Sequence, residues 1–145
     1  MMEDFATKQD LIDRFGQTEL VQLTDRTNRP PTTVDDTTVS QALGDASALA
    51  SGYVGKIYQL PFAEVPPALV KSVADIARYY LHGRRAEKDG EVERAYKEAV
   101  GWLKDIARGV VQLDVGGVPP AQPEGGSVQI SGPQRRFSRD TLRGM

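Results

Sequence analysis

The sequence predicts a mainly α-helical fold: a small bundle of three long helices with one or two short N-terminal helices, followed by an extended C-terminal arm containing short β segments. Apolar residues recur at steps of three and four over three long stretches, which is the helical period. Glycine, proline and aspartate mark the ends of those stretches. Beyond residue 109 this period is lost and glycine and proline become frequent. We therefore divide the chain into a helical body, residues 1–109, and an extended linker with a C-terminal arm, residues 110–145.

The composition supports a folded body. Of the 145 residues, 39% are apolar and 26% are charged, so a hydrophobic core can form and global disorder is not expected. The absence of cysteine excludes disulfides, zinc–thiolate sites and cysteine nucleophiles. No apolar run approaches the roughly 20 residues that span a bilayer, and the acidic start MMEDFATKQD lacks the apolar segment of a signal peptide. We expect a protein made and used in a cytoplasm, or carried in a particle assembled there, with no membrane partner.

Charge is unevenly distributed along the chain. Residues 1–65 carry five basic and ten acidic residues, a net charge of −5. Residues 66–112 have a net charge of +2, and residues 113–145 have +1. The total of −2 does not favour tight binding of nucleic acid over the whole surface, whereas the asymmetry favours head-to-tail assembly or a charged docking tail.

The short helices come first. Thr7 and Asp10 have the spacing of a capping box, and Gly16 should end the helix that they begin. Residues 18–23 continue as one or two helical turns. The stretch TDRTNRPPTT, residues 24–33, is predicted to be a solvated loop because prolines and small polar residues cannot build a core.

The first long helix should begin with a cap at Asp35 or Asp36 and run to about Gly55. Its alanines allow another helix to approach closely, and each of Gly44 and Gly52 weakens it by roughly 1 kcal/mol relative to alanine. Such a helix must be held by packing against other elements.

The central helix is predicted over residues 66–85, PPALVKSVADIARYYLHGRR. A proline pair suits its first turn, and Gly83 offers a C-terminal cap. Its apolar stripe faces the core, and the opposite face carries Lys71, Asp75 and Arg78. The last long helix is predicted over residues 91–108 and ends at Gly109.

The C-terminal arm alternates extended and flexible stretches. VVQLDV at 110–115 and SVQIS at 127–131 are predicted to be short strands or extended segments. GGVPPAQPEGG at 116–126 is a linker, and residues 132–145 form a tail with four arginines. We favour a tail that docks on a partner over a passive one, because apolar anchors accompany the arginines. The candidate docking residues of the arm are Val128, Ile130, Arg135, Arg136, Phe137, Arg139, Leu142 and Arg143.

The sequence offers little for catalysis or cofactor binding. His82 is the only histidine and lies at a predicted helix end, where a capping role is favoured over a catalytic one because no G-x-S-x-G nucleophile motif is present. The pair Asp35-Asp36 is favoured as a helix cap over a metal site. We therefore predict no catalytic, cofactor-binding or metal-binding residues.

One basic cluster could contact phosphate or a neighbouring subunit. The alternative is a solvated helix end whose charges are balanced by nearby acids, and this alternative is favoured. The residues of the cluster are Arg78, Arg84, Arg85 and Lys88.

Several stretches, taken in order, resemble the Mu-like phage family of small head–tail connector proteins. These stretches are DLIDRFGQTELVQLTDR, an alanine-rich helix ending in YVGKIYQLPFAEVPP, DIARYYLHGRR, YKEAVGWLKDIARG and VVQL. The similarity covers roughly Ala6 to Leu113, and the residues after Asp114 match no family pattern.

The resemblance implies a virion structural protein with no enzymatic activity and no cofactor. It implies a ring, usually of twelve subunits, that lies beneath the portal in the virion neck and is assembled in the host cytoplasm. The partners implied are the portal protein, a head-closure or tail protein and further copies of the chain, with non-specific contact to duplex DNA in the lumen. On this chain the body would form the ring, and the arm after Gly109 would reach the portal or a neighbouring subunit.

Two alternatives remain open at the level of the sequence. The chain could be another neck or tail-completion protein, for which the ring remains but the neighbours change. It could also be a small DNA-binding regulatory protein that uses the cluster from Arg78 to Lys88, and duplex binding would then weaken steeply with salt.

Overall fold

The structure, a computed structural model, describes residues 4–114 of the chain. Within this range it is helical and has no strand, so the mainly α prediction is confirmed. Three of the helices are long, as the periodicity predicts. The elements are α1 (Lys8–Phe15), α2 (Gln17–Thr24), α3 (Asp36–Val54), α4 (Pro67–His82), a short 3-10 turn η1 (Gly83–Arg85) and α5 (Glu91–Ala107).

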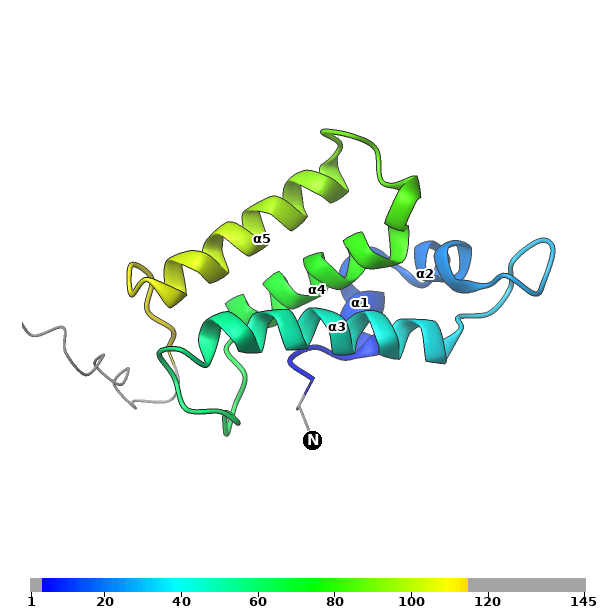
Figure 1. Cartoon of the computed structure of the whole chain (residues 1–145). Helices are drawn as coiled ribbons and strands as arrows, with labels where there is room; N and C mark the ends of the chain where they lie inside the picture. The colour runs from blue at the N-terminus through cyan, green and yellow to red at the C-terminus, as the bar shows by residue number, and fades with distance from the viewer. Residues whose placement is uncertain (1–3, 115–145) are drawn as a thin grey trace, which may run out of the picture.

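Helix α4 is the central element of the bundle. It lies between α3 and α5, and the short helices α1 and α2 also pack against it (Figure 1). Its residues from Ser72 to Ala77 are consecutively buried, which happens only when a helix is covered on nearly all sides. The prediction that Asp75 lies on a solvent face is therefore wrong: Asp75 is 8% exposed and binds Lys71 Nζ at 2.9 Å.

The predicted helix caps are present. The Thr7 hydroxyl accepts a hydrogen bond from the Asp10 N–H, and the Asp10 carboxylate accepts one from the Thr7 N–H, which completes a capping box. Gly16, with φ of +89°, ends α1 and begins α2. At the start of α3 the cap is Asp35, whose carboxylate accepts from the Thr37 N–H at 3.1 Å.

Small residues let α3 approach α4 closely. Ala42, Ala46 and Ala50 are all buried, whereas Ala48 is exposed on the outer face of α3.

No helix in the described part of the chain is both long and apolar enough to cross a membrane.

The segment after α5 packs back onto the body. Residues 110–114 form no strand, so the predicted β segment is absent from this part of 110–115. Leu113 is 6% exposed and joins the core, and its N–H donates a hydrogen bond to the Tyr58 hydroxyl at 2.7 Å. The packed helical body thus includes Leu113. The boundary between body and arm that the sequence places at residue 109 stays a prediction.

Candidate interaction surfaces

An ion pair joins the central helix to α2. Arg78 Nη2 lies 2.8 Å from Glu19 Oε1, and Arg78 Nε lies 3.2 Å from Glu19 Oε2, so the guanidinium grips the carboxylate with two nitrogens. The side chains are 16% and 24% exposed. The Arg78 guanidinium also lies over the Phe15 ring, 4.4 Å from its centroid. Arg78 therefore has partners within its own chain, and its predicted role at DNA or a neighbouring subunit stays a prediction.

His82 belongs to the same cluster. Its Nε2 lies 3.5 Å from Glu19 Oε1 and makes no hydrogen bond to the rest of residues 4–114. The backbone cap of α4 comes instead from Gly83, whose N–H donates to the Tyr79 carbonyl. His82 thus flanks the Arg78–Glu19 pair.

The remaining basic residues of the predicted cluster lie on the connection between α4 and α5. Arg84, Arg85 and Lys88 are all exposed there. Arg85 Nη1 lies 3.5 Å from the Gln22 carbonyl oxygen at the end of α2. These three residues share one end of the molecule, but Arg78 is turned inward and does not join them. Among residues 4–114 no three histidine or acidic side chains are grouped so that they could hold a metal ion.

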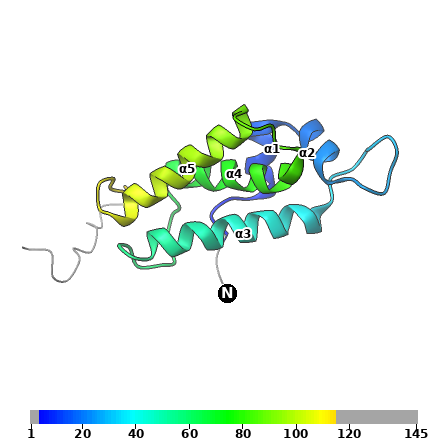
Figure 2. The ribbon, with the colours of Figure 1, turned by 45° about the horizontal axis from the view of Figure 1, so that its top comes forward.

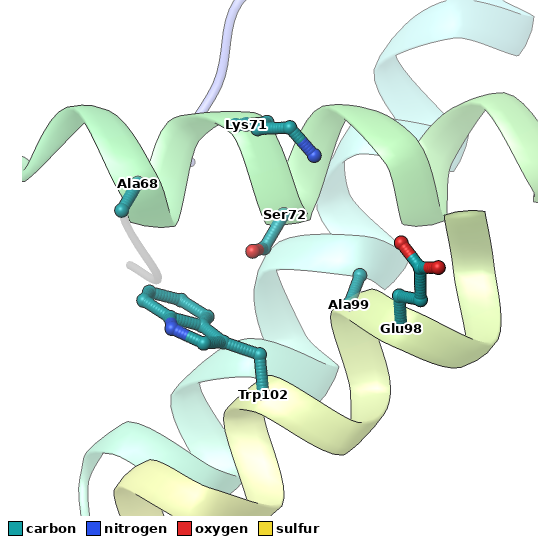
Figure 3. A pocket seen from close by; sticks show the side chains of 6 residues that line it. All are labelled: Ala68, Lys71, Ser72, Glu98, Ala99 and Trp102. Carbon is teal, nitrogen blue, oxygen red and sulfur yellow. The ribbon is translucent and has the colours of Figure 1, made fainter. Parts of the chain in front are cut away.

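A groove between α4 and α5 was not predicted from the sequence (Figure 3). It has a volume of about 270 Å³, and the indole ring of Trp102 extends across it toward Ala68. The only signal in the sequence was the position of Trp102 beside the buried stripe of its helix. The residues that line the groove are Ala68, Lys71, Ser72, Glu98, Ala99 and Trp102.

Three tyrosines pack together where α4 meets the first half of α5. Tyr79 and Tyr96 stack with ring centroids 4.1 Å apart, and Tyr80 lies 6.1 Å from Tyr96. All three are half-buried. Burial raises the pKa of Tyr80, and Tyr96 and the carboxylate of Asp45 on α3 add to this effect. We call the three rings with Asp45 the tyrosine face.

The loop between α2 and α3 is built around one carboxylate. The Asp25 oxygens accept hydrogen bonds from the backbone N–H groups of Thr27, Asn28, Thr32 and Thr33 at 2.9–3.1 Å. The Asn28 side chain donates a further bond at 2.9 Å. These donors, with the Thr32 N–H first, hold the pKa of Asp25 far below its ordinary value. The predicted solvated loop is present, since residues 26–33 are exposed, but Asp25 at its start is only 9% exposed and is not one of the charges that keep the loop in water.

The two ends of this loop are tied together as well. The Thr24 hydroxyl donates to the Leu20 carbonyl at 2.7 Å and accepts from the Asp35 N–H at 3.0 Å. Residues 26–33, which we call the prong, project from the body at the start of α3 (Figures 1 and 2). The sequence signal that could have found this arrangement is an aspartate placed just before a run of threonine and asparagine.

The predicted docking residues of the arm lie outside the described residues. They are Val128, Ile130, Arg135, Arg136, Phe137, Arg139, Leu142 and Arg143.

Comparison with known proteins gives the family. The family model described as Bacteriophage Mu, Gp36 matches residues 5–131. The chain is 33% identical to Gene product J of Escherichia phage Mu over 140 residues, which covers 94% of this chain and 95% of that protein. It is 30% identical to the Mu-like prophage FluMu protein gp36 of Haemophilus influenzae over 109 residues, 75% of this chain and 74% of that protein.

The similarity extends further than the sequence motifs suggested. The resemblance was expected to end near Leu113, whereas the family match includes the glycine- and proline-rich stretch 116–126. The expectation that residues after Asp114 match no family is therefore wrong for residues 115–131. The chain belongs to the phage Mu Gp36 family.

Proposed function

We propose that this chain is a head–tail adaptor: a structural, non-enzymatic virion protein that forms a ring between the portal and the head-closure or tail proteins. The observation that carries the proposal is membership of the phage Mu Gp36 family along nearly the whole chain. The resemblance that we describe for its motifs is to small head–tail connectors.

The described helices are compatible with that role. A closed ring of identical subunits needs heterologous contacts, in which one surface of a subunit meets a different surface of the next. An acidic N-terminal half and a more basic remainder provide such complementarity. A ring through which DNA passes should not hold it tightly, and the net charge of −2 agrees with this.

In this proposal, the basic connection between α4 and α5 is available for contact with DNA or a neighbouring subunit. Arg84, Arg85 and Lys88 are exposed, but Glu87 and Asp89 lie among them. The mixed charge suits a weak, salt-sensitive contact. Replacing both Arg84 and Arg85 by alanine should leave head–tail joining intact if DNA contact is not required.

In vitro joining of phage heads and tails tests the proposal. A phage lacking this gene product should accumulate filled heads and free tails. Its heads should fail to join wild-type tails, while its tails should join wild-type heads, because an adaptor belongs to the head. Purified chain added to the mutant heads should restore joining. Mature particles formed without the chain would refute a structural role.

The same experiment separates the adaptor from a tail-completion protein. For a tail-completion protein the defect would lie in the tails, and mutant heads would join wild-type tails normally. Crosslinking adds a second criterion, since the adaptor proposal expects peptides of the arm, residues 132–145, to be linked to portal peptides.

A further inference from the structure

The prong has the properties of a preformed binding element. Its residues Arg26, Arg29, Pro30 and Pro31 are all exposed. Neither arginine has an ion-pair partner among residues 4–114. The neighbouring acid, Asp25, is already satisfied by the backbone of its own loop. The prong therefore offers two free positive charges and two prolines on a fixed scaffold.

Ordering this loop has no evident benefit for the core of its own subunit. Fixing a backbone residue costs about 1–2 kcal/mol in conformational entropy, and the exposed tip buries no apolar surface in return. The hydrogen bonds to Asp25 offset that cost. A shape that is fixed before binding loses less entropy on binding, which is the usual advantage of preorganisation.

The tyrosine face offers the complementary chemistry on the same chain. Proline-rich segments dock on surfaces lined with aromatic rings, and an arginine can lie over the face of a tyrosine ring. Tyr79, Tyr80 and Tyr96 form such an aromatic cluster and are each partly exposed. Asp45 is exposed on α3, the helix that packs against the α4 helix of Tyr79 and Tyr80, and it has no ion-pair partner within the part of the chain that the structure describes. Its carboxylate can receive a guanidinium.

A second copy of this chain accounts for the prong better than DNA does. Two arginines would neutralise only about two phosphates, and prolines add nothing to phosphate binding. On the tyrosine face, both the arginines and the prolines find partners. The prong extends from the start of α3 (Figure 1), whereas the residues of the tyrosine face belong to α3, α4 and α5. Contact between these different surfaces is heterologous and can repeat from subunit to subunit.

We propose that the prong of one subunit docks on the tyrosine face of a neighbouring copy, with Arg29 facing Asp45. This inference rests on the proposed ring and specifies which two surfaces form its subunit contact.

Cysteine crosslinking in assembled particles tests the contact directly, since the natural chain has no cysteine. Thr32 uses its backbone N–H to bind Asp25, so Thr32→Cys should leave the loop intact. Ala48 is exposed on α3, one turn beyond Asp45 and about three turns from the start of that helix, so a link within one subunit is not expected. On oxidation, the double variant T32C/A48C should give a ladder of linked subunits. The control T32C/K104C, with its second cysteine at an exposed position of α5, should not.

Charge exchange tests the named pair. Arg29→Glu and Asp45→Arg should each reduce the yield of joined particles by about tenfold, because each variant places like charges opposite one another. The combined variant R29E/D45R should recover most of the yield. Circular dichroism of each variant should show a wild-type helical spectrum.

These results separate the contact from the proposed function. If T32C/A48C restores joining of mutant heads but gives no ladder, or the same ladder as the control, the prong contact is refuted and the adaptor function stands. Failure of R29E/D45R to recover the yield also counts against the pair, and a matching loss of duplex binding by R29E would assign the prong to DNA. If wild-type chain fails to restore joining, the adaptor function is refuted, whatever the ladder shows.

Discussion

At the scale of single residues, the Arg78 guanidinium and the Glu19 carboxylate hold α4 against α2 although they lie 59 positions apart in the chain. The Phe15 ring beneath the guanidinium brings α1 into the same contact. No pattern in the sequence could identify Glu19 as the partner, because residues so far apart share no helical period. For that reason the helical period places Arg78 on the face opposite the apolar stripe, among the surface charges.

Replacing Arg78 by alanine should lower the free energy of unfolding by about 2 kcal/mol, because it leaves the half-buried Glu19 carboxylate without its charged donor. Arg78→Lys should lose less, since it keeps the charge but not the two-nitrogen grip. Urea denaturation measures both changes. Arg94→Ala, at an exposed position of α5, is the control and should change stability by less than about 0.5 kcal/mol. Equal losses in the Arg78 and Arg94 variants would mean that the pair is not structural.

Asp25 should make stability depend on pH in the acidic range. Its pKa in the folded chain is depressed, so the ionised carboxylate contributes stability that is fully present above about pH 4. That contribution is lost as the pH falls below this value toward the folded-state pKa. The variant D25N should be less stable than wild type at pH 7, and the difference should shrink at pH 3 and below. A difference independent of pH would show that the Asp25 charge does not stabilise the loop.

At the scale of elements, local chemistry was sufficient to predict the helices. The caps at Thr7 and Asp35, the prolines at the start of α4 and the glycines at 16 and 83 each act on their immediate neighbours, and each is present in the structure. The number of buried residues on α4 was underestimated, because that number depends on how many other helices pack against α4. The shape of the prong was missed because one carboxylate accepts hydrogen bonds from backbone N–H groups two to eight residues further along the chain, and no helical or strand period marks such an arrangement.

Two glycines of α3, Gly44 and Gly52, meet no packing requirement within the described residues. A methyl group added at Gly44 or Gly52 would contact no neighbouring atom, and neither residue has a positive φ. Each change to alanine should therefore raise the free energy of unfolding by about 0.5–1 kcal/mol. Thermal unfolding followed by circular dichroism measures the gain. Gly55→Ala is the contrasting variant, since its methyl group would lie 2.7 Å from the Ser51 carbonyl oxygen, and it should be destabilising.

At the scale of the whole molecule, one helix organises the body and the end of the described chain returns to it. Leu113 and Val111 pack against the same core as α3, α4 and α5. The sequence placed the end of the body at Gly109 because the helical period stops there. A period cannot show whether the following residues fold back, since that depends on an apolar site elsewhere, here beside Tyr58.

Two shortened chains should therefore differ in stability. A chain ending at residue 114 keeps Leu113 and its hydrogen bond to Tyr58, whereas a chain ending at 109 loses both. The shorter chain should be less stable by about 3 kcal/mol, which combines the burial of one leucine with one buried hydrogen bond. Urea denaturation of the two chains measures this difference. Equal midpoints would place the limit of the folded body at Gly109.

The adaptor function is tested most directly by cryo-electron microscopy of the neck of purified virions, combined with mass spectrometry of the same particles. We expect a ring of density directly beneath the portal into which the described helices fit, with adjacent subunits meeting through different surfaces. Particles whose neck has no density for these helices, and in which the chain is undetectable, would contradict the adaptor function.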